Sequence, residues 1–211
     1  MRRLFYSIIV CLSAASAFAA SDSLVFDTVS SSSSVIYDTV RSTFADGSVA
    51  RVYTVLHGTE TRDGVALTYH PNGKVAIEAP YHNGKLNGVF RSYYENGKFW
   101  KTIGYKDGVE EGYSIDFHEN GVKRLRESYK KGVLNGVSEE WDEKGVLRRK
   151  IPYVAGQMHG VAQIYDELGA LKEEMTFERG IRQGEYRRYN KGVKVMEALF
   201  QGNRCVQNCN F

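Results

Sequence analysis

A lattice of glycines constrains this chain more than any other feature. Gly64, Gly73, Gly84 and Gly88 define the spacing G-x8-G-x10-G-x3-G, which recurs with a period of 24 residues. Five consecutive copies cover residues 64–183 without a slip, and 20 of the 21 glycines in the chain fall on this lattice. Because chance does not produce such spacing, the chain is an array of repeated structural units.

Each unit holds two strand-length segments between its glycines. The segments are rich in aromatic and β-branched residues and end in turn sequences such as PNG, ENG, HNG and KDG. Glycine supplies positive φ at these turns without steric cost, so one unit is a β-hairpin with its connection. A lone hairpin is marginal in water, whereas stacked hairpins stabilise one another. The predicted fold is therefore all-β, an elongated single-layer antiparallel sheet of stacked 24-residue β-hairpin repeats.

The lattice also predicts the domain boundaries. A signal peptide at 1–19 precedes a Ser-rich linker or edge segment at 20–43. The repeat domain covers 44–204, with a degenerate copy before the five regular units and a shortened copy after them. A C-terminal tail follows at 205–211.

The first residues have the pattern of a secretory signal peptide. Arg2 and Arg3 precede an apolar run at 4–12, and Ala-Phe-Ala at 17–19 fits the cleavage rule. We expect the mature chain to start at Ala20 and to be exported, to the periplasm or the extracellular space. An uncleaved anchor is the alternative, although the apolar run is short for a membrane span. No later segment is apolar for long enough to cross a bilayer, so no transmembrane segment is expected after cleavage.

Charge and cysteine content narrow the classes of partner. The whole sequence has 28 basic and 25 acidic residues, and removal of Arg2 and Arg3 leaves 26 against 25, a net charge of +1. This balance gives no reason to expect nucleic acid or an anionic membrane as partner. Cys205 and Cys209 are predicted to form a disulfide in an oxidising compartment, with a redox-active pair as the alternative.

The loop sequence ENG predicts the register of each hairpin. We expect a three-residue loop with the glycine in the left-handed region, as in a G1 bulge. Opposite charges then face each other across the strands, which supports this register. The predicted cross-strand pairs are His118–Val122, Asp116–Arg124, Ser114–Arg126 and Glu140–Arg148.

The same register gathers aromatic side chains on one face of the sheet. Burial of each ring contributes roughly 1.5–3 kcal/mol, so the stripe is mainly structural. A single layer nevertheless leaves part of the stripe uncovered, as a groove for a partner. The predicted stripe consists of Tyr69, Tyr93, Phe117, Trp141 and Tyr165, together with Tyr81, Tyr105, Tyr129, Tyr153 and Phe177.

The copies resemble the MORN repeat in its variant form. SYYENGKFWKTIGYKDGVEEG and DFHENGVKRLRESYKKGVLNG closely match its Y-x-x-N-G element and the Y-x-x-G-x-x-x-G that follows. The resemblance covers about residues 44–204. It implies an elongated, curved antiparallel sheet with an aromatic stripe. For function it implies either an antitoxin-like component of a toxin–antitoxin system or a protein or membrane-associated scaffold.

Sequence motifs for catalysis or metal binding are missing. No H-x-x-x-H, His/Cys cluster or G-x-S-x-G occurs. The protein is therefore expected not to be an enzyme and to have no catalytic residues, no metal site and no cofactor. A basic cluster is interpreted as a charged face that opposes association between sheets, with an anion-binding patch as the alternative. Its members are Lys123, Arg124, Arg126, Arg148, Arg149 and Lys150.

One unit carries extra aromatic residues on the face that is polar in the other copies. By the predicted register, Phe90, Tyr94 and Trp100 lie on that face. Gly104, the one glycine off the lattice, lies opposite Gly88 and leaves bare backbone beside the rings. We predict a local ligand site at these three aromatic residues.

Tyr93 and Tyr105 of the aromatic stripe are predicted as further ligand contacts. The leading ligand is another protein or peptide, bound along the aromatic surface of the sheet. A carbohydrate of the cell envelope is the alternative ligand. Cover of the exposed rings by residues 20–43 of the same chain is a third interpretation.

Overall fold

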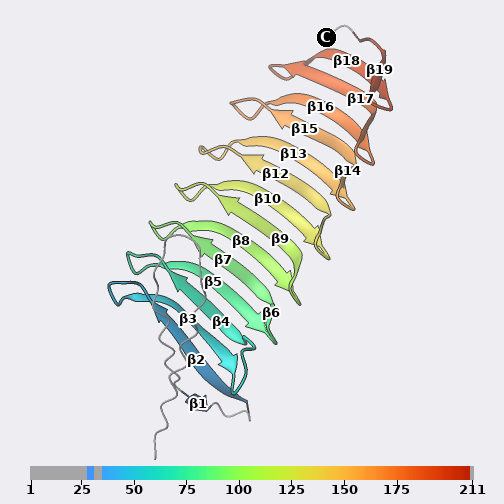
Figure 1. Ribbon diagram of the computed structural model, residues 1–211. Coiled ribbons are helices and arrows are strands. Elements are labelled where there is room, and N and C mark those ends of the chain that lie inside the picture. Colours follow the sequence, from blue (N-terminus) through green and yellow to red (C-terminus); the bar gives the residue numbers. More distant parts are fainter. Residues whose placement is uncertain (1–27, 31–34, 210–211) are drawn as a thin grey trace, which may run out of the picture.

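The computed structural model describes residues 28–30 and 35–209. These residues form one 19-stranded antiparallel sheet, with no helix among them. Successive hairpins lie side by side, so the first and last hairpins stand at opposite ends of a long twisted ribbon (Figure 1). The predicted all-β fold of stacked hairpins is confirmed. The predicted signal peptide at 1–19 lies outside the described residues.

Long strands and short connecting strands alternate along the chain. In chain order the strands are β1 (Thr28–Ser30), β2 (Ile36–Thr43), β3 (Val49–Leu56), β4 (Gly64–Tyr69), β5 (Val75–His82), β6 (Lys85–Leu86), β7 (Gly88–Tyr93), β8 (Phe99–Lys106), β9 (Val109–Phe117), β10 (Lys123–Lys130), β11 (Val133–Leu134), β12 (Gly136–Trp141), β13 (Leu147–Val154), β14 (Gln157–Met158), β15 (Gly160–Tyr165), β16 (Leu171–Glu178), β17 (Ile181–Asn190), β18 (Val193–Gln201) and β19 (Arg204–Gln207). Strands β5, β10 and β13 pair both with a two-residue strand and with the long strand after it.

Two-residue turns form one edge of the sheet. In the turn between β5 and β6, Asn83 and Gly84 have φ of 48° and 76° and connect the paired residues His82 and Lys85. Two successive positive φ angles define a type I′ turn, whose twist matches that of the flanking strands. The recurring NG, DG and KG dipeptides therefore give this edge its hairpins.

Three-residue loops form the opposite edge. The His118 N–H donates to the Val122 carbonyl oxygen at 2.8 Å, and Gly121 has φ of 92°. The predicted three-residue loop and the His118–Val122 pair are confirmed here. All twenty lattice glycines have positive φ, whereas Gly104 does not.

A β-bulge follows each three-residue loop, and the predicted register is wrong beyond it. Lys123 pairs with Phe117, but Leu125 then pairs with Asp116, which leaves Arg124 as an extra residue. The extra residue reverses the alternation of every later side chain in that strand. The pairs Asp116–Leu125, Ser114–Glu127 and Glu140–Arg149 replace the predicted Asp116–Arg124, Ser114–Arg126 and Glu140–Arg148. The extra residues of the regular units are Ala76, Trp100, Arg124, Arg148 and Lys172.

The bulges divide the predicted aromatic stripe between the two faces of the sheet. Tyr93 pairs with Phe99 on the loop side of the bulge, whereas Tyr105 lies beyond it and pairs with Gly88. Since neighbouring residues of a strand point to opposite faces, the expectation of a single aromatic face is wrong. We name the two faces by these columns. The core face carries Tyr81, Tyr105, Tyr129, Tyr153 and Phe177, and the ladder face carries Tyr69, Tyr93, Phe117, Trp141 and Tyr165.

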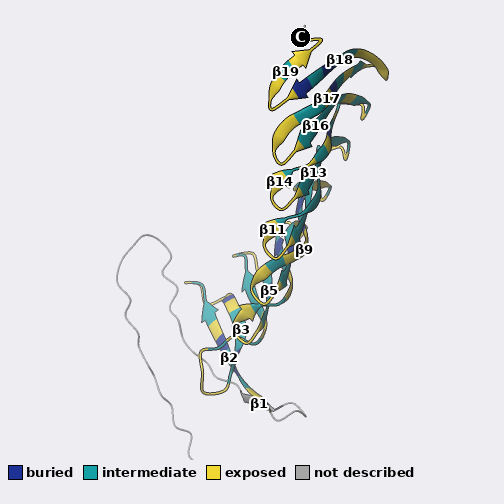
Figure 2. Ribbon diagram, turned by 90° about the vertical axis from the view of Figure 1, so that its right-hand side faces the viewer, coloured by how far each residue is buried: buried dark blue, intermediate teal, exposed yellow. Residues whose placement is uncertain are grey.

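Burial is almost confined to the core face. Ala50, next to the loop between β2 and β3, is the exception among the buried residues of the described chain. Figure 2 shows intermediate burial along most of the ribbon and exposed turns at its margins. The buried residues of the core face are Asp38, Val40, Val55, Ala79, Ser92, Ile103, Ser114, Asp116, Ala162, Tyr186, Ala198 and Phe200.

Strands β1 and β2 belong to the segment predicted as a linker or edge segment. β2 pairs with β3 from Tyr37–Leu56 to Thr43–Val49, and β1 pairs with β2. The described part of this segment therefore extends the sheet at its N-terminal end. It does not lie over the aromatic residues of β7 and β8. Within the plane of the sheet, the four long strands β2, β3, β4 and β5 lie between β1 and β7.

Candidate functional site

The aromatic residues predicted as a ligand site separate into three pairs of contacts. The rings of Phe90 and Tyr105 meet edge-to-face on the core face, with centroids 6.4 Å apart. Tyr94 and Trp100 form a second pair at 6.5 Å, close to the three-residue loop. Tyr93 lies on the ladder face and stacks on a neighbouring ring at 5.0 Å. The five residues therefore do not enclose one site.

The Tyr94 side chain links its own repeat to the next one. Its hydroxyl donates to the Phe117 carbonyl oxygen at 2.8 Å. The equivalent side chains of neighbouring units, His70 and His118, lie 2.9 Å from the carbonyl oxygens of Tyr93 and Trp141. This recurring contact is structural. Because the Tyr94 hydroxyl already donates its hydrogen bond to Phe117, it is not available as a donor to a ligand.

Gly104 also has a structural role. It pairs with Val89 and not with Gly88, because the bulge shifts the register by one residue. A Cβ atom at position 104 would lie 2.2 Å from the backbone oxygen of Glu111. The missing side chain therefore allows β8 and β9 to approach closely, and it does not leave room for a ligand.

Trp100 is the extra residue of its bulge and is 52% exposed. A bulged residue has no direct partner in the opposite strand. Of the predicted site residues, Trp100 offers the largest free aromatic surface.

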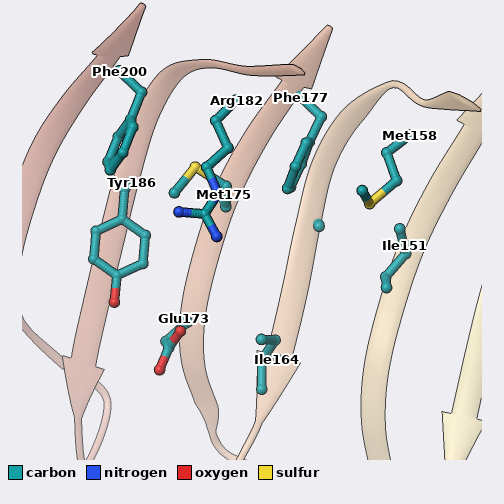
Figure 3. Close-up of a pocket in the computed structure, with 10 residues that line it drawn as sticks. Ile151, Met158, Ile164, Glu173, Met175, Phe177, Arg182, Tyr186 and Phe200 are labelled. Carbon is teal, nitrogen blue, oxygen red and sulfur yellow. The ribbon is translucent and has the colours of Figure 1, made fainter. Parts of the chain in front are cut away.

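A hollow that the sequence analysis did not predict lies on the core face across β13 to β18. It has a volume of about 510 Å³ and is open on one side. Figure 3 shows its side chains projecting from successive strands into one shared space. The residues that line it are Ile151, Met158, Ala162, Ile164, Glu173, Met175, Phe177, Arg182, Tyr186 and Phe200.

The floor of the hollow is well packed at its C-terminal end. The rings of Tyr186 and Phe200 meet edge-to-face with centroids 6.4 Å apart, and Ala198 beneath them is 1% exposed. Met175 and Met196 pack against this cluster. Methionine adapts its shape to irregular surfaces, so these side chains suit a variable apolar ligand.

Two charged residues line opposite sides of the hollow. Glu173 lies toward the three-residue loops, and Arg182 lies toward the two-residue turns (Figure 3). Burial raises the pKa of the Tyr186 hydroxyl, and the charge of Glu173 raises it further. The hydroxyl therefore stays protonated at neutral pH beside the apolar floor.

The sequence contains a signal for this hollow that the predicted register concealed. Apart from Met1, the methionines of the chain are Met158, Met175 and Met196, all in the last units. The predicted register placed Tyr165 and Phe177 on one face, which puts Ile164, the neighbour of Tyr165, on the face opposite Phe177 and Met175. A register with the bulge would have grouped these apolar residues on one face.

The arginines of the basic cluster are paired with carboxylates. Each of the four arginines in this cluster lies within 4.0 Å of a carboxylate oxygen, so the four guanidinium charges are balanced locally. The pairs are Arg124–Asp116 at 2.5 Å, Arg126–Glu139 at 2.6 Å, Arg148–Asp142 at 3.3 Å and Arg149–Glu140 at 3.3 Å.

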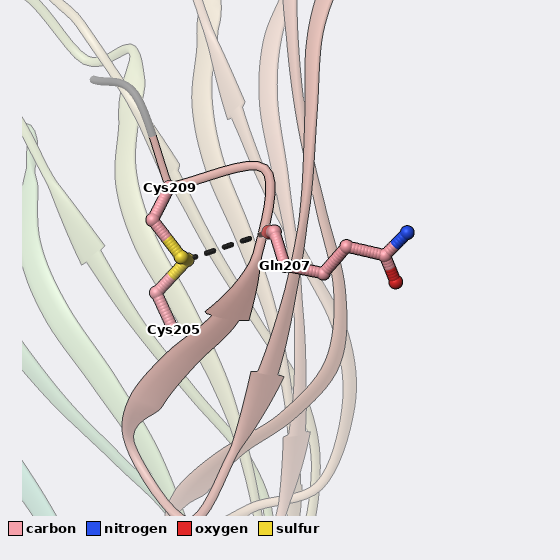
Figure 4. The surroundings of a disulfide bond; sticks show 3 residues. All are labelled: Cys205, Gln207 and Cys209. Carbon is pink, nitrogen blue, oxygen red and sulfur yellow. Dashed lines mark hydrogen bonds between the residues drawn. A yellow bond between two sulfur atoms is a disulfide. The ribbon is translucent and has the colours of Figure 1, made fainter.

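The predicted disulfide between Cys205 and Cys209 is present, with the Cα atoms 5.8 Å apart (Figure 4). The Sγ atom of Cys205 lies 3.5 Å from the Gln207 carbonyl oxygen, and Cys205 packs against the cluster that contains Phe200. The bond therefore fixes the tail beside the C-terminal end of the hollow.

The described residues offer neither a cluster of metal ligands nor a membrane-spanning helix. They contain no group of three or more His, Cys, Asp or Glu residues placed to hold a metal ion. Within the same part of the chain, no helix combines the length and apolar character that a membrane span requires.

Comparison with known proteins identifies the repeat. The family model of the MORN repeat variant matches residues 62–83, 86–107, 134–155 and 158–179. No curated protein matches the chain. Each matched segment contains one three-residue loop and the strands on both sides of it. In these four segments the chain is therefore built from repeats of the MORN variant family.

Proposed function

We propose that this protein is a non-enzymatic scaffold that binds another protein or a peptide in the hollow of its core face. Repeats of this type generally bind proteins or membranes. The observation that carries the proposal is the hollow itself, which is open, largely apolar and lined from six successive strands. An open apolar surface of this kind marks an interaction site more often than a solvated face.

The chemistry of the lining favours side chains of a protein as ligand. Ile164 is 38% exposed, and Met175 and Phe177 lie next to it across the hollow. Burial of one leucine or methionine of a partner in such a surface contributes roughly 1.5–3 kcal/mol. Glu173 and Arg182 supply charges of opposite sign at the margins, which can fix the orientation of the bound chain.

A photo-crosslinking experiment tests this proposal. p-Benzoylphenylalanine is placed at Ile164 on the core face or at Val161 of the same strand, which is 46% exposed on the ladder face. In the producing cell, we expect protein adducts from Ile164 and few from Val161. Met175→Glu, which puts a charge on the floor, should abolish the Ile164 adducts in a protein that still folds.

The relative yields of the adducts from the two positions can also contradict the proposal. Adducts of similar yield from Ile164 and Val161, or adducts at Ile164 that survive Met175→Glu, would show that the hollow does not bind the partner. Circular dichroism and urea unfolding of each variant confirm that the compared proteins are folded. A toxin-like partner, as the resemblance implied, would be identified by mass spectrometry of the adduct.

A cell-envelope carbohydrate is the second candidate ligand, and the exposure of Trp100 favours it. Sugars stack on exposed aromatic rings, and the Trp100 ring has a neighbour, Tyr94, at 6.5 Å. Retention on purified cell-wall glycan that is lost in Trp100→Ala would support this function. Equal retention of the variant and the native protein would exclude a role for this ring.

Export is proposed on the basis of the disulfide. A disulfide such as Cys205–Cys209 persists in oxidising compartments and is rare in the cytosol. Alkylation of free thiols in fractionated cells tests this location. We expect the exported fraction to resist alkylation until a reductant is added, whereas a protein that is alkylated at once would contradict it.

A further inference from the structure

Two groups of charge on the core face lie apart along the long axis of the sheet, one before the hollow and one at its C-terminal end. Glu110 and Glu127 lie on the core face in β9 and β10, before the hollow begins. Arg182 and Arg188 lie on the core face in β17, near its far end. The core face thus carries two carboxylates before the hollow, and two arginines with one carboxylate, Glu173, at its C-terminal end.

The acidic group is not neutralised by neighbouring cations. Among the described residues, Asp116 forms salt bridges with Lys101 and Arg124, but none involves Glu110 or Glu127. Glu127 accepts a hydrogen bond from the neutral Tyr129 hydroxyl at 2.9 Å. Burial, that hydrogen bond and the nearby carboxylates, Glu110 included, raise the pKa of Tyr129.

The basic group contains two arginines beside the one carboxylate of Glu173, so its net charge stays positive. Arg182 and Arg188 are both exposed, and in the part of the chain that the structure describes neither forms a salt bridge. The Arg182 guanidinium lies 5.8 Å from the centroid of the Phe200 ring. Arg188 faces Glu173 across the strands.

The floor of the hollow restricts the conformation of its ligand. The backbone N–H and C=O groups of β13 to β17 are used in pairing within the sheet, so the hollow offers mainly side chains. An extended peptide on this floor would leave its own backbone polar groups unpaired, which costs about 1–3 kcal/mol for each buried group. An α-helix pairs these groups internally.

The spacing of the strands gives the length of such a helix. Five strand-to-strand steps separate β10 from β17, through β12, β13, β15 and β16. At about 4.8 Å for each step, the distance is about 24 Å. A helix rises about 1.5 Å per residue, so about 16 residues span from the acidic to the basic group.

We propose that the hollow binds an amphipathic α-helix of about 16 residues in one orientation, with a basic N-terminal half over Glu110 and Glu127 and an acidic C-terminal half over Arg182 and Arg188. The apolar stripe of the helix packs on the floor around Met175. The helix dipole adds to this preference, because its positive N-terminal end meets the carboxylates and its negative end meets the arginines. This inference rests on the proposed function and names the class of partner.

The probes are three synthetic 16-residue peptides with the same leucine stripe. The first has lysines in its N-terminal half and glutamates in its C-terminal half, the second has these charges exchanged, and the third has glutamine at all these positions. The same hydrocarbon staple on the solvent side gives all three equal helicity. Binding to the full chain is measured by fluorescence anisotropy at low and at high salt.

The first peptide is expected to bind about tenfold more tightly than the second at low salt, because several exposed charge pairs change sign together. High salt should reduce this difference, since exposed charges are screened over about 10 Å or less. The double variant Glu110→Gln/Glu127→Gln should lose most of the preference. The control Glu143→Gln/Glu167→Gln changes the net charge equally at two loops and should keep it.

Each other result decides against the inference. If all three peptides bind equally and Met175→Glu abolishes binding, the hollow is a binding site without the proposed polarity. If the second peptide binds more tightly than the first, the orientation is wrong. If no peptide binds while the Ile164 crosslink to a natural partner forms, the partner is not such a helix and the proposed function stands alone.

Discussion

The core face and the ladder face carry half-buried aromatic columns at the same period, yet the fully buried residues of the described chain lie almost only on the core face. Phe200 on the core face is 5% exposed, whereas Phe99 on the ladder face is 40% exposed. The ladder face is crossed instead by ion pairs that join neighbouring units at one repeat position, at three of the junctions between them. They are Arg91–Glu78, Arg126–Glu139 and Arg187–Glu174, at 3.5, 2.6 and 3.8 Å.

The difference between the faces depends on one residue per repeat. Without the bulge, the aromatic residues at both ends of each hairpin would lie on the same side, as the alternation of a regular strand requires. The bulge moves the second column, which includes Tyr105, to the core face. A single extra residue therefore decides which of two similar aromatic columns lies on the core face.

Deletion of the bulged residue should have the largest effect. Removal of Trp100 restores regular alternation in β8 and takes Ile103 and Tyr105 off the core face. Loss of their burial at roughly 1.5–3 kcal/mol each predicts a decrease of about 3–6 kcal/mol in the free energy of unfolding. Urea unfolding followed by circular dichroism measures it.

Trp100→Ala is the control for this deletion. It removes the ring but keeps the number of residues, so a loss of only about 1 kcal/mol or less is expected. If the deletion and the substitution have equal effects, the bulge does not determine the faces.

The deletion also concerns the part of the fold that the sequence did not predict. The turns were predictable, because glycine and the NG-type dipeptides mark positive φ at fixed positions. The bulge was not, since the extra residues share no chemistry: they are Ala76, Trp100, Arg124, Arg148 and Lys172. Their common property is a place in the backbone, three residues after the loop glycine.

A matched pair of phenylalanines compares the faces directly. Phe200→Ala should decrease the free energy of unfolding by about 3–5 kcal/mol, as is usual for a buried ring. Phe99→Ala removes the same atoms from the ladder face and should cost about half as much. Thermal and urea unfolding of both variants measure the difference, and equal losses would mean that the faces contribute equally.

The candidate site shows the same limit of sequence reasoning. Phe90, Tyr94 and Trp100 were correctly recognised as unusual for the repeat, but their contacts depend on the bulge. The hollow around Met175 needed the face of every strand to be assigned correctly. Residue types alone could locate the methionines in the last units, and only the register could bring them together.

Gly104→Ala tests how closely the strands approach on the ladder face. The new Cβ would lie 2.2 Å from the Glu111 backbone oxygen, so β8 and β9 must move apart. Overpacking of this kind is expected to cost about 1–3 kcal/mol. Ser128→Ala, at the same repeat position in β10, should change the stability by about 0.5 kcal/mol or less. A neutral Gly104→Ala would contradict the close approach.

The smallest effect is expected from acid, and it separates a carboxylate on the core face from one on the ladder face. The hydrogen bond with His57 lowers the pKa of Asp38, as do the Gly58 N–H and the charge of His57. A folded-state pKa below the unfolded value, about 3.9, means that the stabilisation is present above that pH and is lost as pH falls through the folded pKa. Asp38→Asn should therefore flatten the decline of stability below about pH 4.

Glu197 on the ladder face is the control for this prediction. Its pKa is lowered by Lys194 and Arg187, but it is more exposed than Asp38. Solvent therefore screens its ion pairs, and Glu197→Gln should flatten the decline of stability less. Urea midpoints between about pH 7 and pH 2 compare the two variants, and an equal or greater effect of Glu197→Gln would show that burial on the core face does not strengthen the acid dependence.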